Sequence, residues 1–270
     1  MSSKRTKRNN YFKSLNHFSK KRKSDLMPGL KGFVCTCNGN MKACITEGLH
    51  LLDEYNSKIN PEENKFEGIE DCDDIEKAIM EEVKYERENV KFRAIDTGIN
   101  NCIFIGTTID NPVEIVETIA KEIESTKVQR SRNLIRMLPV EITCKAFLDD
   151  IKKAACNIFE KHFICDPVSF SIVLTKRSNT NLNRMEVIEE LVLLVKDRNL
   201  NHKVDLNSPA KSVIVEIIRN ICCLSVVNNF HGYMKLNLIA LERIEVALWG
   251  EYWLYCWVHQ IFISEAFFRV

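Results

Sequence analysis

A run of basic side chains between Lys127 and Lys153 is the part of the sequence best suited to binding a charged ligand. Four cations come before the first acid of this run, Glu141: Lys127, Arg130, Arg132 and Arg136. Lysine and arginine bind phosphate groups through charge and hydrogen bonds, and they need no catalytic group to do so. The run therefore predicts a surface that holds a phosphate-rich ligand.

Further cations lie on the elements expected after this run. Thr143 is suited to cap a helix that extends to about His162, and Val168–Lys176 has the pattern of a strand. The apolar stripe of that helix would be Phe147, Ile151, Ala154, Ala155 and Ile158. The cations on these elements are Lys145, Lys152 and Lys153 on the helix, and Lys176 and Arg177 at the end of the strand. From the residues alone, an alternative stays open, in which these charges only form solvated faces.

Sequence motifs of enzymes are missing from the chain. It has no GxxxxGK[ST] phosphate loop, no GxGxxG and no HExxH zinc motif. Asp149 and Asp150 are adjacent, so on a helix their carboxylates do not converge on one substrate atom. None of the eleven cysteines has CxxC spacing, and we expect reduced, buried thiols. The sequence predicts a protein that is not an enzyme and has no cofactor, metal or small-molecule substrate.

Charge is distributed unevenly along the chain, although the formal net charge is only +1. Residues 1–30 hold nine Lys or Arg and one Asp or Glu. Residues 31–125 hold ten basic and twenty-one acidic residues, and residues 126–227 hold sixteen basic and eleven acidic residues. Such asymmetry indicates segments with different partners. We expect a disordered basic arm at 1–27, an acidic domain at 28–126 with an acidic loop at 56–74, a basic domain at 127–228 and an aromatic tail at 229–270.

The order of the predicted elements indicates an α+β protein. The strand predicted at Leu134–Leu138 either completes the first domain or opens the second. A helix capped by Asn183 and a hairpin of Lys211–Ile218 and Ile221–Val227 complete the second domain. The first domain has most of a ferredoxin-like unit, namely a strand at Gly32–Cys37, a helix at Met41–Tyr55, a possible short helix at Ile75–Val83, a hairpin at Lys91–Thr107 and a helix at Pro112–Ser125.

Several segments in sequence order resemble the small THUMP-domain proteins that assist tRNA cytidine acetylation. The Val-Asp-Leu-x-x-Pro turn at Val204–Pro209, followed by a VEI strand, is typical of a THUMP domain. The resemblance extends from about Pro28 to Val227 and implies a ferredoxin-like domain followed by a THUMP domain. The segments that carry it are PGLKGFVCTCNGN, GINNCIFI, LIRMLPVEITCKAFLDDIKK and KVDLNSPAKSVIVEIIRNICCLSVV.

This resemblance implies an RNA-binding adaptor. In that family, tRNA is presented to a separate RNA cytidine acetyltransferase, which forms N4-acetylcytidine in serine and leucine tRNAs and would itself bind acetyl-CoA and ATP. THUMP domains are RNA-binding modules thought to read the shape of a tRNA acceptor end. We therefore expect all nine cations named above to contact RNA. A stand-alone RNA-modifying enzyme and a general RNA-binding protein remain the alternatives.

The sequences of the two terminal segments indicate the cellular compartment that we expect. The N-terminus lacks the apolar segment of a secretory signal, and KKRK at Lys20–Lys23 could be a nuclear address or a nucleic-acid tether. We expect the nucleus, nucleolus or cytoplasm. The uncharged run Tyr252–Ser264 has 13 residues, too few to span a membrane, so a membrane partner is not expected.

Overall fold

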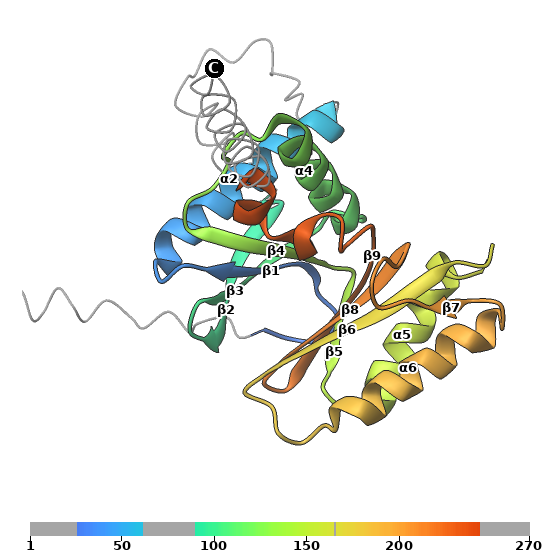
Figure 1. Cartoon of the computed structure of the whole chain (residues 1–270). Coiled ribbons are helices and arrows are strands. Elements are labelled where there is room, and N and C mark those ends of the chain that lie inside the picture. The colour runs from blue at the N-terminus through green and yellow to red at the C-terminus, as the bar shows by residue number, and fades with distance from the viewer. Residues whose placement is uncertain (1–25, 62–89, 165, 244–270) are drawn as a thin grey trace, which may run out of the picture.

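The computed structural model describes residues 26–61, 90–164 and 166–243. This part of the chain forms two β-sheets that pack on one another, with helices on their outer sides (Figure 1). Sheet A has the strand order β2-β3-β1-β4, and sheet B has the order β5-β9-β8-β6-β7. The predicted α+β class is confirmed.

Sheet A is a complete β-α-β-β-α-β unit. All its neighbouring strands are antiparallel, and β4 lies at an edge beside β1, which is the ferredoxin-like arrangement. The strand predicted at Leu134–Leu138 is part of β4, so it completes the first domain. The elements are β1 (Lys31–Cys37), α2 (Met41–Ile59), β2 (Phe92–Ile99), β3 (Cys102–Thr107), α4 (Pro112–Thr126) and β4 (Leu134–Val140).

Sheet B combines parallel and antiparallel pairs. Because β9 is antiparallel to both β5 and β8, and β6 is parallel to β8, strands β5, β6 and β8 all run in the same direction. Helices α5 and α6 follow β5 and β6, so both helices begin at the carboxyl ends of these strands. The elements are β5 (Ile142–Lys145), α5 (Leu148–His162), β6 (Ser169–Arg177), α6 (Arg184–Arg198), β7 (Lys203–Val204), β8 (Lys211–Ile218) and β9 (Ile221–Asn228).

Asparagine side chains define the starts of three helices. The side-chain oxygens of Asn40, Asn111 and Asn183 each accept a hydrogen bond from a backbone N–H in the first turn of α2, α4 and α6. Helix α2 continues past its predicted end at Tyr55 because Tyr55 and Asn56 are buried. The first residues of the predicted 56–74 loop are therefore helical, whereas the rest of that loop and the predicted helix at Ile75–Val83 lie outside the described residues.

The prediction for the segment around Thr143 is wrong. Thr143 lies in β5, and its hydroxyl donates to the Met27 carbonyl and accepts from the Leu30 N–H, both at 2.8 Å. Helix α5 begins only at Leu148, and its N-cap residue Phe147 is 64% exposed and makes no side-chain cap bond. Lys145 consequently ends a strand and is not on the helix. Contacts with the chain before β1 override the local capping preference of threonine.

One apolar cluster joins the two sheets. Phe33, Cys35 and Met137 of sheet A belong to it, together with Ile218 and Cys223 of sheet B, and all five residues are almost inaccessible to water. The other face of sheet B packs on α5 and α6 in a second cluster. Sheet B is therefore buried on both faces, and its orientation relative to sheet A is fixed by the shared cluster.

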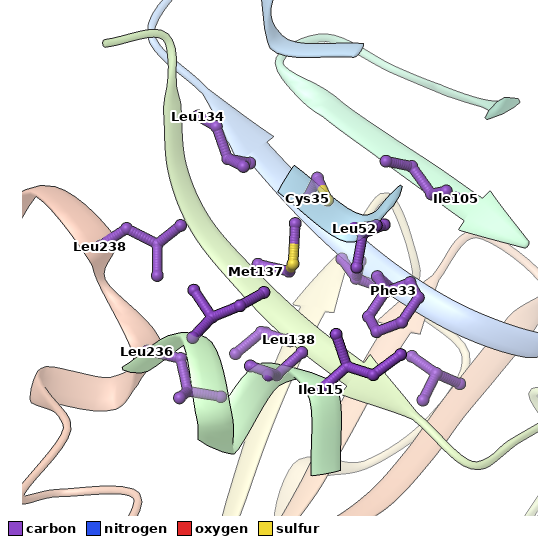
Figure 2. Packing of buried hydrophobic residues seen from close by; sticks show 14 of the residues in the cluster. Phe33, Cys35, Leu52, Ile105, Ile115, Leu134, Met137, Leu138, Leu236 and Leu238 are labelled. Atoms are coloured by element: carbon purple, nitrogen blue, oxygen red, sulfur yellow. The ribbon is translucent and has the colours of Figure 1, made fainter. Parts of the chain in front are cut away.

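The segment after β9 folds back onto sheet A. Leu236 and Leu238 are fully buried in the shared cluster, and Figure 2 shows them beside β4. Asn237 forms an isolated antiparallel bridge with Arg136, so this segment covers the outer edge of β4. The boundary placed between residues 228 and 229 stays a prediction. The apolar run Tyr252–Ser264 lies outside the described residues.

One carboxylate fastens the α4–β4 connection to α2. Glu47 accepts hydrogen bonds from the backbone N–H groups of Arg132, Asn133 and Leu134 at 3.1, 2.8 and 3.0 Å, and Asn133 Nδ2 donates at 2.6 Å. Burial acts to raise the pKa of Glu47. The side chain of Asn133 and the three backbone N–H groups outweigh that effect, so the pKa of Glu47 lies below its usual value.

We expect the substitution E47Q to lower the free energy of unfolding by about 1–3 kcal/mol, because hydrogen bonds to a charged acceptor become bonds to a neutral one. The folded-state pKa is the lower one, so this stabilisation is present above the unfolded pKa of about 4.3 and is lost as pH falls through the folded value. Urea unfolding of the wild type and of E47Q, at about pH 7 and at about pH 3, measures this stabilisation and its loss.

The matched control for E47Q is E189Q, which removes one charge from an exposed position on α6. We expect E189Q to change the free energy of unfolding by less than about 0.5 kcal/mol. A difference between wild type and E47Q that stays the same at acid pH would contradict the role given to the ionised carboxylate.

Candidate RNA-binding surface

The carboxyl ends of β5, β6 and β8 bring cations from separate elements to one end of sheet B. Lys145 ends β5, Arg177 ends β6, and Arg219 lies in the β8–β9 turn. The Arg219 N–H donates to the Arg177 carbonyl at 2.9 Å, and the Ala146 N–H donates to the Asn220 carbonyl at 2.8 Å. These backbone bonds hold the ends of β5 and β6 against the β8–β9 turn.

One end of sheet A meets this end of sheet B. The Asn38 N–H donates to the Asn133 carbonyl at 2.9 Å, and the Cys37 N–H donates to the Asn101 carbonyl at 3.1 Å, so the residues before β4 and the β2–β3 turn lie at the same end of sheet A. Gly98, with φ of +70°, is in direct contact with the guanidinium of Arg219, and a Cβ there would clash with it. Figure 1 shows the β8–β9 turn on the same side of the molecule as β2 and β3.

We call the exposed or partly exposed cations at this meeting point the strand-end surface. It comprises Arg132, Arg136, Lys145, Arg177 and Arg219. Helices α5 and α6 also begin here, and the positive ends of their dipoles add to the field, although Asp149 and Glu186 in their first turns reduce it. The arrangement favours binding of anions at this end of the molecule.

A buried carboxylate lies between cations of the two sheets. Glu216 is only 4% exposed, and its Oε2 lies 3.4 Å from Nε of Arg177. Burial raises the pKa of Glu216 above its usual value, although the charge of Arg177, hydrogen bonds from Thr175 and Arg177, and the charge of Arg136 act to lower it. Glu216 therefore pairs with Arg177 of its own sheet and lies within the field of Arg136 of the other sheet.

Apolar side chains border the strand-end surface. Phe147 precedes the first turn of α5 and is 64% exposed, and Met185 in the first turn of α6 is 57% exposed. An exposed aromatic ring beside cations can stack on a nucleic-acid base. The sequence pattern had placed Phe147 on the buried stripe of the helix, and the extension of β5 to Lys145 is the reason for its exposure.

The structure brings together four of the nine predicted cations: Arg132, Arg136, Lys145 and Arg177. Lys176 is close to them, but its Nζ donates to the Leu182 carbonyl at 2.6 Å. The remaining four lie elsewhere: Lys127 donates to the Leu241 carbonyl, Lys152 pairs with Glu190 at 2.6 Å, Lys153 is exposed on α5, and Arg130 packs between helices. Arg219 was not predicted, although its place between two β-rich runs marked it as a turn residue.

Arg130 ties helices together and is mostly covered. Its guanidinium pairs with Glu122 of α4, lies 3.6 Å from Glu54 of α2, and packs over the ring of Tyr55. Its backbone N–H donates to Glu242 at 3.1 Å. The hydrogen bond to Glu122 is the largest effect that raises the pKa of Arg130. These contacts give Arg130 a structural role.

A groove with two glutamates in its lining lies at the other end of the molecule. It has a volume of about 530 Å³ and lies between the first turns of α4, the end of α5 and the end of β9. Glu114, Glu117, Lys121, His162 and Asn228 are among the residues that line it. The two acids of this groove both belong to α4.

Two further findings concern only the described residues. In residues 26–61, 90–164 and 166–243, no group of three or more His, Cys, Asp or Glu side chains could hold a metal ion. No helix in the same ranges is both long enough and apolar enough to cross a lipid bilayer.

Comparison with known proteins finds relatives over most of the chain. THUMP domain-containing protein 1 from Bos taurus is 38% identical over 226 residues, which cover 79% of this chain and 63% of the relative. The THUMP domain-containing protein 1 homolog from Drosophila melanogaster is 35% identical, covering 84% of this chain and 78% of the relative. The protein named tRNA acetyltransferase TAN1 from Saccharomyces cerevisiae is 25% identical, covering 79% of this chain and 85% of the relative.

The family model of the THUMP domain matches residues 145–227. Lys145, Arg177 and Arg219 fall inside the matched range, whereas Arg132 and Arg136 precede it. The strand-end surface therefore combines residues of the THUMP domain with residues of the ferredoxin-like domain. The chain spans slightly less than two thirds of the length of the Bos taurus relative.

We expect the substitution R130M to lower the free energy of unfolding by about 1–3 kcal/mol, because it removes one of the two cations that Glu122 and Glu54 share and leaves only Lys58. The substitution R132M should change it by less than about 0.5 kcal/mol, because the Arg132 side chain is exposed. Chemical unfolding followed by circular dichroism compares the two variants. Equal losses would contradict the structural role of Arg130.

Proposed function

This chain belongs to the THUMP domain-containing protein 1 family, and we propose from that membership that it binds tRNA through the strand-end surface. The observation that carries the proposal is the meeting of four arginines and one lysine from both domains at one end of the molecule. Phosphate contacts from such cations supply affinity and orientation with little reading of base sequence. The ligand would be recognised by the shape of its backbone.

The position of the cations on rigid elements supports this proposal. Lys145 and Arg177 end strands of a sheet that is buried on both faces, and Arg219 is held in a turn by the Arg177 carbonyl. The backbone at these positions is already ordered, so binding loses no backbone freedom there and more of the interaction energy appears as affinity. Phe147 offers an aromatic face for a base at the border of the same surface.

The proposed role of the bound complex is to present tRNA to a separate RNA cytidine acetyltransferase. The Saccharomyces cerevisiae relative is named a tRNA acetyltransferase, which connects the family with acetylation of tRNA. N4-acetylcytidine in serine and leucine tRNAs is the expected product. The end of α4 that carries Glu114 and Glu117 is the proposed contact with the partner protein, because its charge repels RNA and leaves the cationic end open.

A second candidate function is that of an acetyltransferase acting without a partner, which the name of the Saccharomyces cerevisiae relative favours. A third, a general RNA-binding protein, predicts no effect on acetylation. Removal of the protein from cells should reduce N4-acetylcytidine in tRNA if either of the first two functions is correct. Unchanged N4-acetylcytidine in such cells would favour the third.

We expect purified protein with unmodified tRNA, acetyl-CoA and ATP to form no N4-acetylcytidine until an RNA cytidine acetyltransferase is added. With that enzyme present, the protein should increase the yield at limiting tRNA, because it raises the local concentration of correctly oriented substrate. Mass spectrometry of digested tRNA measures the product. Product formed without the added enzyme would contradict the adaptor proposal and support the second candidate.

We expect the triple substitution R132E/K145E/R219E to weaken tRNA binding at least tenfold at moderate salt. The dependence of affinity on salt should also become shallower, by about one unit of slope for each lost phosphate contact. Fluorescence anisotropy with labelled tRNA at several salt concentrations measures both quantities.

The matched control is K121E/K161E/K196E, which makes the same change in net charge at exposed positions on α4, α5 and α6. Lys161 and Lys196 lie in the last turns of their helices, at the end of sheet B opposite the strand-end surface. The control should weaken binding less than about threefold, through the overall field alone. Equal effects of the two triple variants would place the RNA elsewhere.

A further inference from the structure

We propose that Glu216 holds Arg177 in place beside Arg136, so that the two arginines form a preformed site for one phosphate group where the two sheets meet. Glu216 acts as a positioning residue, and the two arginines bind the ligand. The inference depends on the proposed function only for the source of the phosphate, which is the backbone of tRNA. The site itself is inferred from the burial of Glu216, the register of β8 and the N–H donors of the two arginines.

The register of β8 places a carboxylate in an apolar contact face. Side chains two residues apart on a strand share a face, so Glu216 lies between Ile214 and Ile218. Both isoleucines are buried in the cluster that joins the sheets. An apolar residue at position 216 would suit this face, and replacing a buried ion pair by apolar residues is often neutral or stabilising. The carboxylate at this position is therefore better explained by binding than by stability.

The charges around Glu216 leave an excess of positive charge. One carboxylate interacts with the guanidinium of Arg177 at 3.4 Å and with the charge of Arg136 from the other sheet. Two guanidinium groups stay charged in proteins, so one carboxylate neutralises only half of their charge. In a partly buried place the uncompensated charge attracts an anion more strongly than it would in open water.

Donors that an anion needs are present on both arginines. Nε of Arg136 is buried and has no hydrogen-bond partner within the described part of the chain. Arg177 directs its Nε to Glu216, and its side chain is 29% exposed, so part of the side chain can be reached from solvent. A guanidinium oriented in this way offers two parallel N–H groups to phosphate oxygens.

Arg219 extends the same site toward solvent. Its backbone N–H is bound to the Arg177 carbonyl, and its guanidinium contacts Gly98 of sheet A. It therefore stands beside the proposed site on the exposed side, where the next phosphate along a nucleic-acid strand would approach. The excess charge, the donor without a partner and the partly exposed side chain of Arg177 all favour an oxyanion as the ligand.

The decisive variant is E216Q. Its tRNA affinity should rise if Glu216 is only a negative charge near the RNA, and it should fall if Glu216 is a positioning residue. If Glu216 only added negative charge near RNA, E216Q would bind tRNA more tightly. If Glu216 orients Arg177 beside Arg136, E216Q should bind tRNA about five- to twentyfold more weakly. E186Q removes a charge from an exposed position in the first turn of α6 and should leave binding equal or slightly tighter. E216Q that binds as tightly as wild type would overturn the positioning role.

A second measurement uses the wild-type protein and does not depend on the folding of any variant. Inorganic phosphate is titrated into ¹⁵N-labelled protein, and the Nε–Hε signals of Arg136 and Arg177 are followed by NMR. Both signals should shift with the same millimolar dissociation constant, and the Arg130 signal should not shift. Unchanged signals of Arg136 and Arg177 at high phosphate would overturn the site.

The two measurements separate the site from its biological source of phosphate. Shifts with inorganic phosphate, together with no binding of tRNA to the wild-type protein, would retain the site and reject the proposed function. Binding of tRNA without shifts of Arg136 and Arg177, either with phosphate or with tRNA, would retain the function and reject the site. R177K provides a further check, because it keeps the charge but removes the paired N–H groups, and it should weaken phosphate binding severalfold.

Discussion

The packing of sheet A on β8 and β9 of sheet B is the contact on which the other features of this protein depend. Ile218 and Cys223 of sheet B share a buried cluster with Val34 and Leu138 of sheet A, so the two sheets cannot turn relative to one another without exposing apolar surface. This contact brings the end of sheet A that holds the β2–β3 turn and the start of β4 beside the β8–β9 turn. Cations more than eighty positions apart in sequence, Arg132 and Arg219, thereby belong to one surface.

Features encoded by local sequence were predictable. The alternating runs around Asn100 and around Arg219 formed hairpins, and the asparagines at positions 111 and 183 capped helices, because both signals act between residues close in the chain. The α+β class and the family also followed from motifs in sequence order. Short-range hydrogen bonding and side-chain periodicity are sufficient for such predictions.

Features that depend on distant partners were not predictable in the same way. Thr143 has the properties of a helix cap, but its hydroxyl binds Met27 and Leu30, which lie more than one hundred residues earlier. Arg130 lies in a basic stretch of sequence that predicts surface cations, but Glu122, Glu54 and Tyr55 enclose its side chain. Glu216 belongs to the VEI strand that marked the family, but the local sequence did not indicate its ion pair with Arg177, because that partner lies on another strand. The basic composition of the region was visible in the sequence, whereas the division between structural and exposed cations was not.

The return of the chain to sheet A has a consequence for synthesis on the ribosome. Leu236 and Leu238 complete a core that otherwise consists largely of residues before position 141, and the bridge between Asn237 and Arg136 covers the edge of β4. At about 5–20 residues per second, the first domain waits roughly 5–20 seconds for these leucines to be made. During that interval the edge of β4 and part of the core are open to water. The first domain to emerge is therefore among the last to be finished, and its completion depends on the domain that follows it.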